Sequence, residues 1–546
     1  MKKRMKTLIS MGLTFVMALS IIGCGQEQQV NTSETKQSEV ASTTATESVV
    51  EVDPYEAAEM PETVTVFAYK NGKIGEEMVD YNDVASFKLM EELTGTHIEW
   101  EIYGGSEVDQ KMQLMLASEN YTDVMVGAWK KLGATQAYED GVIVNLMDYA
   151  EYMPNFMKYL EENPIVAGDI IEDGRILYFP CLRGDPECSI FYGPVIRTDW
   201  LDKLGLDAPT DPDSLYEVLK AFKTKDPNGN GEADEIPMSG VGSKNLTYVM
   251  PMFDTSREFY IVDGQVKYGP MDKNYDDALA YLAKLYAEDL IDEEYIMQDR
   301  TALVGKITNN SVGFAFEYQP TAVTNTMADK DPSFKFEGIP NFVNSKGEKV
   351  SDNISYITKV MTSYCGAIST DCENIEGTVK WLDSFFSEEG MAIMNFGEEG
   401  VHYTMEGDEY VYTDYMYNNP DFNQDRMFKR EIGTISPFFP GAQLWGAYSN
   451  TLNAAGIAAC ETWADVDVSM ICPALTFTAE ENETVANVMN QVKTYVDEKI
   501  DKIIMGQESV EVMDEVREAI KKMGIEDVLE IYQVAYERYN SIDLAK

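Results

Sequence analysis

Three strand patterns separated by two helical patterns open the globular part of this sequence. Residues 63–69 and 97–103 alternate apolar and polar side chains, and residues 123–127 form a short apolar run. The two stretches between them repeat apolar residues at helical spacing. Strands that are joined by helical crossovers pair in parallel, so this order restricts the region to an α/β fold with a parallel sheet.

The rest of the chain continues to mix the two patterns, without an internal repeat. Further strands are predicted at 174–182 and 311–318, and further helices at 210–225, 276–289, 374–397 and from 483 to the C-terminus. Thr210 and Asp213 are predicted to form the capping pair of the helix that follows them. With about 490 residues outside the N-terminal segment, the chain is long enough for two or three lobes with their own cores.

The first 23 residues have the parts of a secretory signal peptide. A basic start, MKKRMK, precedes an apolar run that is too short to span a bilayer. Ile21, Ile22 and Gly23 lead directly to Cys24, a pattern typical of a bacterial lipobox, in which the cysteine becomes the lipid-modified first residue of the mature chain. The alternative is an ordinary signal peptide that is cleaved elsewhere. We favour lipidation at Cys24, because this cysteine closes the apolar run.

A polar segment follows the signal peptide. Residues 25–54 contain no aromatic residue and are rich in Ser, Thr, Gln and Glu, so they bury too little apolar surface to become ordered. We therefore predict a lipid-anchored flexible linker over 24–60 and a folded domain over 61–546. The domain would stand outside the cell membrane, held to it only through the lipid.

Charge and histidine content exclude several classes of function. The net charge is −51, so nucleic acid is a poor partner. The chain has only two histidines, His97 and His402, and neither HExxH nor GxSxG. A histidine-rich zinc site or a Ser-His-Asp triad is therefore hard to build. A glycosidase needs only two carboxylates, and the sequence does not exclude that possibility.

Six cysteines remain beyond Cys24, an even number that permits disulfides outside the cell. They fall into sequence pairs that could close locally or stay as free thiols, and both interpretations remain open. The pairs are Cys181 and Cys188, Cys365 and Cys372, and Cys460 and Cys472.

The loop KDPNGNGEADEIP, residues 225–237, has the oxygen spacing of a calcium loop. With Asp226 as position 1, candidate ligands fall at positions 1, 3, 5, 7, 9 and 10: Asp226, Asn228, Asn230, the Glu232 carbonyl, Asp234 and Glu235. Six oxygens suit Ca²⁺, and Gly231 at position 6 allows a sharp turn. An EF-hand has a Glu at position 12, where this loop has Pro237, so this would be a shorter loop. The alternative is an Asn/Gly turn without an ion. We favour a structural Ca²⁺ site that fastens the end of the 210–225 helix.

Several segments together resemble a known family. The stretch 196–237, which begins IRTDWLDKLGL, is similar to the large lipoprotein solute-binding components of bacterial ABC importers, family 1, the sugar and oligosaccharide type. The lipobox and the segments 178–206, 381–404 and 504–540 fall in the family's order, so the resemblance covers most of the chain. The calcium-like loop also resembles that of the alginate-binding relatives.

The resemblance implies the type II periplasmic-binding-protein fold, in which two α/β lobes flank a ligand cleft and close on the ligand. The crossing strands would lie near 176–184 and 362–369. The lobes would be discontinuous, with lobe 1 at about 61–180 and 367–445 and lobe 2 at about 185–365 and 446–546. The family is not enzymatic. Its members hand a carbohydrate to the transmembrane subunits of an ABC permease, and we expect a monomer on the extracellular face of the membrane.

The resemblance also implies candidate ligand residues, because sugars bind against aromatic faces with polar groups at the rim. Trp129 and Tyr318 follow strands in what would be opposite lobes, as aromatic residues do in sugar-binding relatives. The further candidates are Tyr69, Trp445, Arg183, Asp185 and Glu187. For the aromatic residues the alternative is a structural ring at a lobe edge. For the charged residues the alternative is a solvated loop.

Two other functions remain open from the sequence. A non-transport glycan-binding surface protein, such as an adhesin or a sensor input, would carry the same cleft. It differs in that it need not close on a small soluble glycan. A carbohydrate-active enzyme is the less favoured alternative, and it would release a product from oligosaccharides.

Overall fold

The computed structural model describes residues 53–541, apart from 71–79, 105–106, 354–355, 357, 423 and 434–437. The signal peptide, Cys24 and most of the predicted linker therefore lie outside the described residues. Within the described part of the chain, no helix combines the length and the apolar character that crossing a bilayer requires.

The parallel sheet predicted at the start of the domain is confirmed. Its strands β1 (Thr63–Tyr69), β2 (His97–Tyr103) and β3 (Val124–Gly127) pair in parallel, with β1 in the middle. A fourth strand, β13 (Cys365–Ile368), joins the other edge of β3 in the antiparallel direction. The chain thus returns from far along the sequence to complete this first sheet.

Helices cover the first sheet as its crossovers require. The predicted helices between the strands are α2 (Ala85–Thr94) and α3 (Glu107–Ser118), and α15 (Ile375–Ser384) packs beside β13. An aromatic cluster closes the core on the α2 side, where the Phe87 and Trp100 ring centres lie 5.2 Å apart. We call the body around this sheet the first lobe; its core residues come from 64–182 and 360–442.

The second lobe is built around a sheet of order β12-β7-β11-β8. Its strands are β7 (Tyr192–Arg197), β8 (Ile236–Ser239), β11 (Val312–Tyr318) and β12 (Phe336–Gly338). Strands β8 and β11 are parallel, whereas β7 runs antiparallel to both β11 and β12. Most of the second lobe's core residues come from 190–342 and 459–535.

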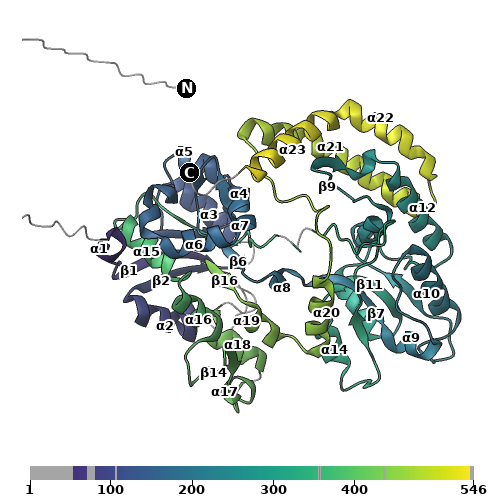
Figure 1. The fold of residues 1–546 in the computed structure, drawn as a ribbon, viewed down its shortest axis with the longest axis horizontal. Coiled ribbons are helices and arrows are strands. Elements are labelled where there is room, and N and C mark those ends of the chain that lie inside the picture. The colour runs from purple at the N-terminus through teal and green to yellow at the C-terminus, as the bar shows by residue number, and fades with distance from the viewer. Residues whose placement is uncertain are drawn as a thin grey trace, which may run out of the picture. The chain divides into compact units, whose positions relative to one another are not determined.

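Long helices enclose the second lobe. They are α10 (Pro212–Thr224), α12 (Asn274–Ala287), α21 (Ala479–Ile504), α22 (Met513–Met523) and α23 (Ile525–Asn540). Figure 1 shows α21 to α23, at the yellow end of the colour scale, lying over α12 on the outside of this lobe. Gly313 of β11 lets α10 approach closely, because a Cβ at this position would lie 2.4 Å from the Phe222 ring.

Two local predictions in these elements are wrong. The cap of α10 is Asp211, whose carboxylate accepts the backbone N–H of Ser214 at 2.8 Å, rather than the pair Thr210 and Asp213. The single strand expected at 174–182 is two short strands, β5 (Arg175–Ile176) and β6 (Cys181–Arg183). The second strand is the one that leads to the other lobe.

The lobes are joined by segments that lie side by side. Strand β6 pairs in parallel with β16 (Gly441–Gln443), and Leu182 makes an antiparallel bridge with Val360. From here the chain enters the second lobe through α8 (Pro186–Ser189), and it crosses again after β16 through α19 (Trp445–Tyr448) and α20 (Ala454–Ala464). Figure 1 shows α8 and α20 between the two lobes.

The structure shifts two expected boundaries. Val360 and Cys365 pack in the first lobe's core, whereas lobe 2 was expected to extend to 365. Helix α1 (Pro54–Ala57) is fastened to the first lobe, where Lys380 Nζ donates to the carbonyl of Tyr55 at 2.7 Å. The flexible linker predicted over 24–60 is therefore wrong for its last residues.

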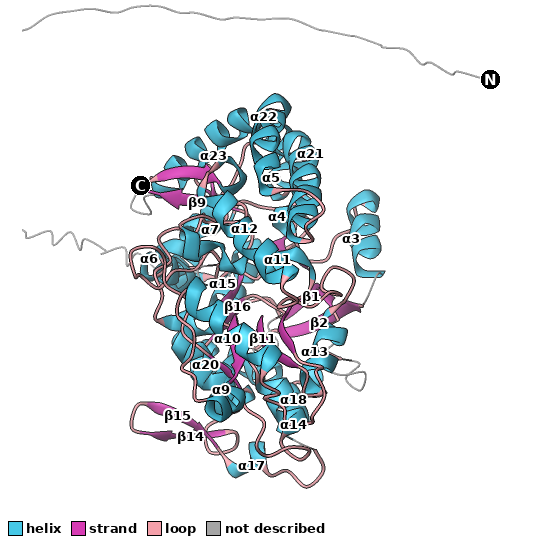
Figure 2. Ribbon diagram, turned by 90° about the vertical axis from the view of Figure 1, so that its right-hand side faces the viewer, coloured by secondary structure: helices cyan, strands magenta, loops and turns pink. Residues whose placement is uncertain are grey.

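A β-hairpin lies outside the two main sheets. Strands β14 (Tyr403–Glu406) and β15 (Glu409–Tyr412) form a hairpin that Figure 2 shows as a separate ribbon near the lower edge.

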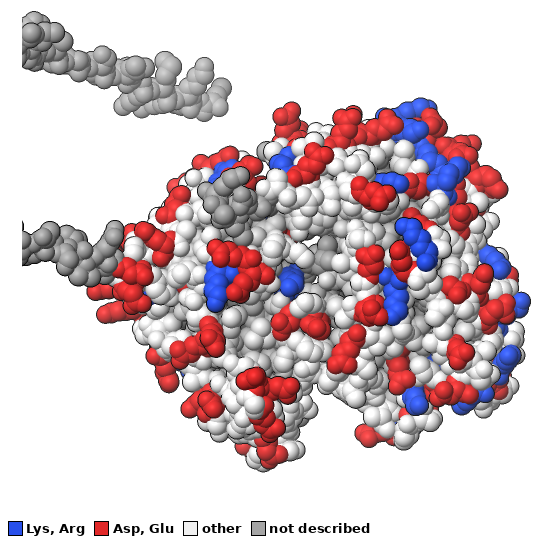
Figure 3. Space-filling model, in the orientation of Figure 1, with Lys and Arg blue, Asp and Glu red and all other residues white. Residues whose placement is uncertain are grey.

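Acidic side chains are spread over both lobes on the face seen in Figure 3. This distribution agrees with the net charge of −51 and is unlike a nucleic-acid-binding surface.

Candidate functional site: a ligand cleft and a metal loop

Tyr318 ends strand β11 and is partly exposed to solvent. Its side chain is 43 % exposed. The ring of Phe191 stacks beside it with 5.6 Å between ring centres, and the Arg300 guanidinium lies 4.6 Å from the Tyr318 ring centre. Tyr318 is the last residue of the strand, so its side chain lies at the edge of the sheet, where it is held by its neighbours but remains accessible.

Arg183 supports this aromatic pair from the crossing strand β6. Its guanidinium lies 4.0 Å from the Phe191 ring centre, and Nη1 donates to the carbonyl of Cys188 at 3.2 Å. Burial lowers the pKa of Arg183. Arg183 therefore connects the first crossing segment to the Tyr318 face.

A cavity of about 370 Å³ lies beside the Tyr318 ring. We call it the proximal cavity. It is lined by Phe191, Tyr192, Val241, Lys244, Asn245, Tyr248, Arg300, Glu317, Tyr318 and Asn353. Its aromatic faces and its amide, hydroxyl and guanidinium groups are those expected of a site that orients a polar, ring-shaped ligand.

Tyr192 and Tyr248 in this cavity were missed by sequence reasoning. Tyr192 lies directly opposite Tyr318 across the antiparallel pair of β7 and β11. Its hydroxyl donates to the carbonyl of Phe316 at 2.7 Å and accepts from Asn245 Nδ2 at 2.6 Å. No local pattern predicts that β7 pairs with β11, so no sequence signal placed Tyr192 beside Tyr318.

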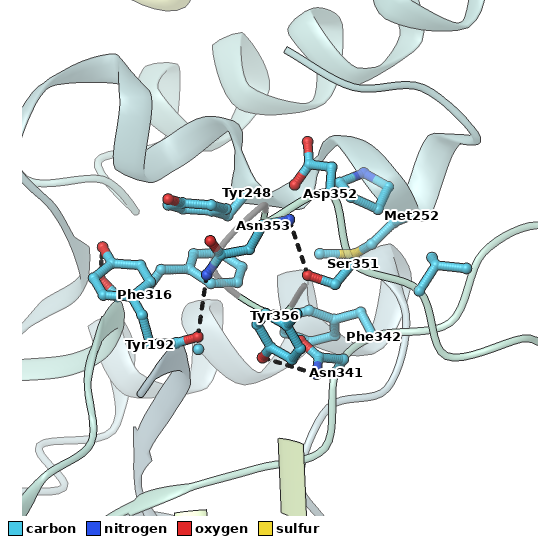
Figure 4. A pocket seen from close by; sticks show the side chains of 13 residues that line it. Tyr192, Tyr248, Met252, Phe316, Asn341, Phe342, Ser351, Asp352, Asn353 and Tyr356 are labelled. Atoms are coloured by element: carbon cyan, nitrogen blue, oxygen red, sulfur yellow. Dashed lines mark hydrogen bonds between the residues drawn. The ribbon is translucent and has the colours of Figure 1, made fainter. Parts of the chain in front are cut away.

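A smaller cavity lies behind Tyr248, and Figure 4 shows the side chains around it. Asn353 donates through its backbone N–H to Ser351 Oγ at 3.1 Å and through Nδ2 to the carbonyl of Tyr192 at 3.4 Å. The cavity holds about 20 Å³, which is room for roughly one water molecule. It is too small for a sugar, and the hydrogen bonds around it hold Asn353 against Ser351 and Tyr192.

Trp129 does not meet the expectation of a half-exposed ring in the cleft. It is 0 % exposed, and its indole N–H donates to the carbonyl of Met125 at 2.8 Å. The physical reason is that helix α4 (Trp129–Leu132) begins at this residue and turns the ring back under β3. In this structure Trp129 is part of the first lobe's core and offers no face to a ligand.

Tyr69 and Trp445 are half-buried but line neither cavity described above. The Tyr69 hydroxyl donates to Asp109 Oδ1 at 3.2 Å, and burial together with this carboxylate raises the pKa of Tyr69 to about 12. The backbone N–H of Trp445 donates to the carboxylate of Asp185. Asp185 thus connects the first and last crossing segments rather than a lobe and a ligand.

Glu187 lies near Lys359, whose pKa is lowered by burial and partly restored by the carboxylates of Asp185 and Glu187. The Lys359 ammonium donates to the carbonyl of Gly184 at 3.2 Å. These charged groups gather where the lobes join. None of them lines the proximal cavity.

The calcium-like loop folds around the side chain of its first residue. The Asp226 carboxylate accepts the backbone N–H groups of Gly229, Asn230 and Gly231 at 2.9 to 3.1 Å. The amide groups of Asn228 and Asn230 both reach the Asp234 carboxylate, at 2.9 and 3.0 Å. The structure therefore brings most of the predicted ligand side chains into contact.

Glu235 is the group that most favours an ion in this loop. It is 3 % exposed, and its buried Oε1 has no hydrogen-bond partner among the described residues. Burial raises its pKa, and the nearby carboxylates of Asp234 and Asp226 raise it further. A cation would satisfy this oxygen and neutralise the three acids, so the residues present fit Ca²⁺.

Amide and carbonyl oxygens would have to complete any such site. Within the part of the chain that the structure describes, no three side chains among His, Cys, Asp and Glu gather into a metal centre on their own. Ca²⁺ takes amide and backbone carbonyl oxygens alongside carboxylates. Asn228, Asn230 and the exposed Glu232 carbonyl are therefore necessary parts of the predicted donor set.

The cysteines that the sequence left open are free thiols. All six of Cys181, Cys188, Cys365, Cys372, Cys460 and Cys472 are buried and unbonded to one another. Burial raises the pKa of Cys365 to about 12, so its thiol stays protonated and unreactive at neutral pH.

Comparison with curated proteins identifies relatives in Streptococcus pneumoniae and Bacillus subtilis. The fructooligosaccharide ABC transporter substrate-binding protein FusA of Streptococcus pneumoniae is 30 % identical over 346 residues, which are 59 % of this chain and 61 % of FusA. Lipoprotein LipO of Bacillus subtilis is 26 % identical over 61 % of this chain and 66 % of its own length. The chain thus spans less than two thirds of the length of either relative.

Solved structures with the same fold cover nearly the whole domain. A FusA EF-hand mutant in complex with fructo-nystose matches with a TM-score of 0.66 at 23 % identity, over 88 % of this chain and 99 % of FusA. The alginate-binding protein AlgQ2, solved without calcium ion, matches with a TM-score of 0.65 at 23 % identity, over 88 % of this chain and 98 % of AlgQ2. These matches confirm the predicted two-lobed periplasmic-binding-protein fold.

A family model also recognises the sequence itself. It describes bacterial extracellular solute-binding proteins and matches residues 70–392, more than half of the chain. This range includes β2 and β3 of the first lobe, the sheet of the second lobe and the crossing strand β6. The protein is therefore a member of the bacterial extracellular solute-binding protein family.

Proposed function

We propose that this protein is a lipid-anchored, extracellular receptor that binds a carbohydrate between its lobes and delivers it to an ABC permease. The observation that carries the proposal is the Tyr318 face: an exposed ring, stacked with Phe191 and supported by Arg183 from the crossing strand. A sugar stacked on this face would contact groups that move relative to one another when the lobes close. The name of FusA, a fructooligosaccharide-binding relative, supports a carbohydrate ligand.

The proposal assigns no catalytic role to the proximal cavity. The residues that line the proximal cavity include only one carboxylate, Glu317, which is buried and paired with Arg300 at 2.7 Å. Glycosidases place two carboxylates on either side of the scissile bond. Incubation with oligosaccharides should therefore leave them intact while they bind.

The direct test of carbohydrate binding is a thermal-shift screen of the domain against diverse oligosaccharides. A ligand that binds only the native state stabilises it by RT ln(1 + [L]/Kd), roughly 4 kcal/mol at a thousandfold excess over Kd. We expect at least one oligosaccharide to raise the melting temperature and to be recovered unchanged. If none does across neutral and acidic glycans, the protein is not a carbohydrate receptor.

The anchoring part of the proposal rests on Cys24, which closes the apolar run of the signal peptide. Cys24→Ser should release the protein into the medium or leave it unprocessed, because the acyl chains have no other attachment site. The measurement is the distribution of protein between membrane and medium, with the free cysteine variant Cys472→Ser as control. Normal processing and membrane retention of the Cys24 variant would refute lipidation at this residue.

Calcium in the 226–235 loop is proposed as a structural ion. The supporting observation is the buried Glu235 oxygen, which has no hydrogen-bond partner among the described residues. An ion held there would fasten the end of α10 to the start of β8. The solved relatives described as calcium-free AlgQ2 and as a FusA EF-hand mutant support calcium as the ion.

A further inference from the structure

A second cavity of about 370 Å³ adjoins the proximal cavity. We call it the distal cavity. The two share Lys244, Tyr248 and Asn353 in their linings, so Tyr248 and Asn353 stand between them. The distal cavity is completed by Thr247, Ser256, Arg257, Glu258, Phe259, Asp352, Tyr532, the five residues from Ile471 to Leu475, and Phe477.

One wall of the distal cavity is aromatic and comes from three separate parts of the chain. Phe259 begins β9 (Phe259–Val262), Tyr532 lies in α23, and Phe477 lies just before α21. The rings of Phe259 and Tyr532 stack with 3.8 Å between centres, and Phe477 lies 4.9 Å from Tyr532. All three residues are half-buried, so each ring keeps an accessible part.

The other side of the distal cavity is polar and fixed. Arg257 Nη2 pairs with Asp497 at 2.6 Å, and its Nη1 donates to Thr247 Oγ1 at 3.1 Å. Ser256 Oγ donates to Asp352 Oδ2 at 2.8 Å. Asp352 and Tyr248 both line the distal cavity, and Figure 4 shows their side chains on the same side of the small cavity. Hydroxyl groups of a sugar would find both donors and acceptors here without a rearrangement of the protein.

The charges that line the two cavities are balanced. Arg257 is paired with Asp497, Glu258 with Lys493, and Arg300 with Glu317. Among the charged residues of the two linings, Lys244 and Asp352 form no ion pair with the described residues, and they carry one charge of each sign. A polyanionic ligand would meet no surplus of positive charge, which favours a neutral glycan.

We infer that the proximal and distal cavities are successive subsites of one groove, which binds a neutral oligosaccharide across the Tyr248 border. The inference rests on the proposed function and specifies its ligand class. Each cavity alone lies within the range of about 300–1,000 Å³ that holds small organic ligands, so the pair exceeds what a single sugar ring needs. One end of the glycan stacks on Tyr318 and the other on Phe477.

The distal subsite also lies at the border between the lobes. Lys130 of the first lobe donates through Nζ to the carbonyl of Ala474 at 3.2 Å, and Ala474 belongs to the lining segment that ends at Phe477. A glycan in the distal subsite therefore touches the segment that meets the first lobe. A glycan too short to reach it engages only the Tyr318 face.

The test is the dependence of affinity on glycan length. Fructo-, gluco-, manno-, xylo- and galacto-oligosaccharides of two to six residues, together with oligogalacturonates, are titrated calorimetrically into the intact domain. We expect one neutral series to gain at least tenfold in affinity between its shortest and longer members. A ring stacked in the distal subsite contributes roughly 1–3 kcal/mol, by analogy with other stacked rings, and 1.4 kcal/mol is a factor of ten.

Variants separate the two subsites. Phe477→Ala should remove the gain with length and leave the affinity for the shortest binding glycan unchanged. Phe477→Leu, which keeps apolar packing but has no flat face, should do the same. Tyr318→Ala should weaken all lengths alike. Phe253→Ala is the matched control, because this half-buried ring packs against Tyr281 and lines neither cavity.

The outcomes distinguish this inference from the proposed function. Affinity that is independent of length, or a length dependence that Phe477→Ala preserves, overturns the distal subsite while carbohydrate binding stands. Binding of oligogalacturonates alone overturns the neutral ligand class. If no series binds at all, both the proposed function and this inference are wrong.

Discussion

At the scale of single residues, Trp129 and Tyr318 have a similar sequence context, but the ring of Trp129 is buried and that of Tyr318 is partly exposed. Each comes at or just after the end of a buried strand, which is why both were expected in the cleft. Tyr318 precedes a residue whose backbone N–H bonds to Phe191, so its ring stays at the edge of the sheet. Trp129 instead begins a helix directly, and its indole bonds back to Met125. The path of the chain beyond the strand, rather than the strand itself, therefore decides whether the ring is exposed.

These two aromatic residues give a paired prediction. Tyr318→Ala should weaken glycan binding by about tenfold or more and change the melting temperature little, because the ring is 43 % exposed before a ligand arrives. Trp129→Ala should do the reverse and cost about 3–5 kcal/mol of stability. Calorimetric titration and chemical denaturation of both variants are the measurements. If Trp129→Ala keeps native stability but loses glycan binding, Trp129 is a ligand residue of the cleft and not a core residue.

Asp169, in helix α7 (Pro164–Ile170), gives a prediction about pH. It is 5 % exposed, its Oδ2 has no hydrogen-bond partner among the described residues, and burial raises its pKa to about 7 against the opposing effect of Lys130. Between about pH 4 and 7 the folded state therefore binds more protons than the unfolded state, so this group lowers stability as pH rises.

Asp169→Asn should remove that loss. The variant should match the wild type near pH 4 and exceed its unfolding free energy at pH 8 by on the order of 2 kcal/mol, with a ceiling of roughly 4 kcal/mol. Urea denaturation across this pH range is the measurement, and Asp173→Asn on the exposed turn nearby serves as control. An advantage that is equal at all pH values would show that Asp169 does not titrate in this range.

At the scale of elements, the loop after α10 shows which structural features a local sequence pattern can predict and which it cannot. Oxygen spacing marks residues 226–235 as a candidate calcium loop, because such a spacing lies within consecutive residues and can be read locally. The cap of α10 was placed at the wrong residue, since Asp211 and Thr210 are both competent caps and only the backbone geometry selects between them. The burial of Glu235 against the start of β8 has no local sequence signal.

This loop predicts a stability response to calcium. EDTA should lower the melting temperature and added Ca²⁺ should restore it, because an ion bound only to the native state stabilises that state. Asp226→Ala should remove the response to Ca²⁺, whatever its effect on the baseline from the loss of three hydrogen bonds to its carboxylate. Asp213→Ala, an acid in the first turn of α10, should respond like the wild type. If the protein is metal-free and neither EDTA nor Ca²⁺ changes its melting curve, the loop is a turn without an ion.

At the scale of the whole molecule, periodicity predicted the first sheet, and resemblance predicted the two lobes. The strands β1 to β3 follow from alternation and crossover rules alone. The antiparallel strands β7 and β13 do not, since each joins its sheet from a distant part of the chain. The candidate site depends on those pairings: Tyr192 meets Tyr318 only through β7. The distal cavity likewise needs Phe259, Phe477 and Tyr532 from three remote segments.

The central claim is that two lobes close around a soluble glycan. The most direct measurement is the radius of gyration of the domain by small-angle X-ray scattering, without ligand and with a saturating oligosaccharide that raises its melting temperature. The account predicts a smaller radius with the glycan, and no such change for the Tyr318→Ala variant at a glycan concentration that saturates only the wild type. A radius that stays the same although the glycan is bound would contradict lobe closure and favour a surface protein that binds glycans at an open face.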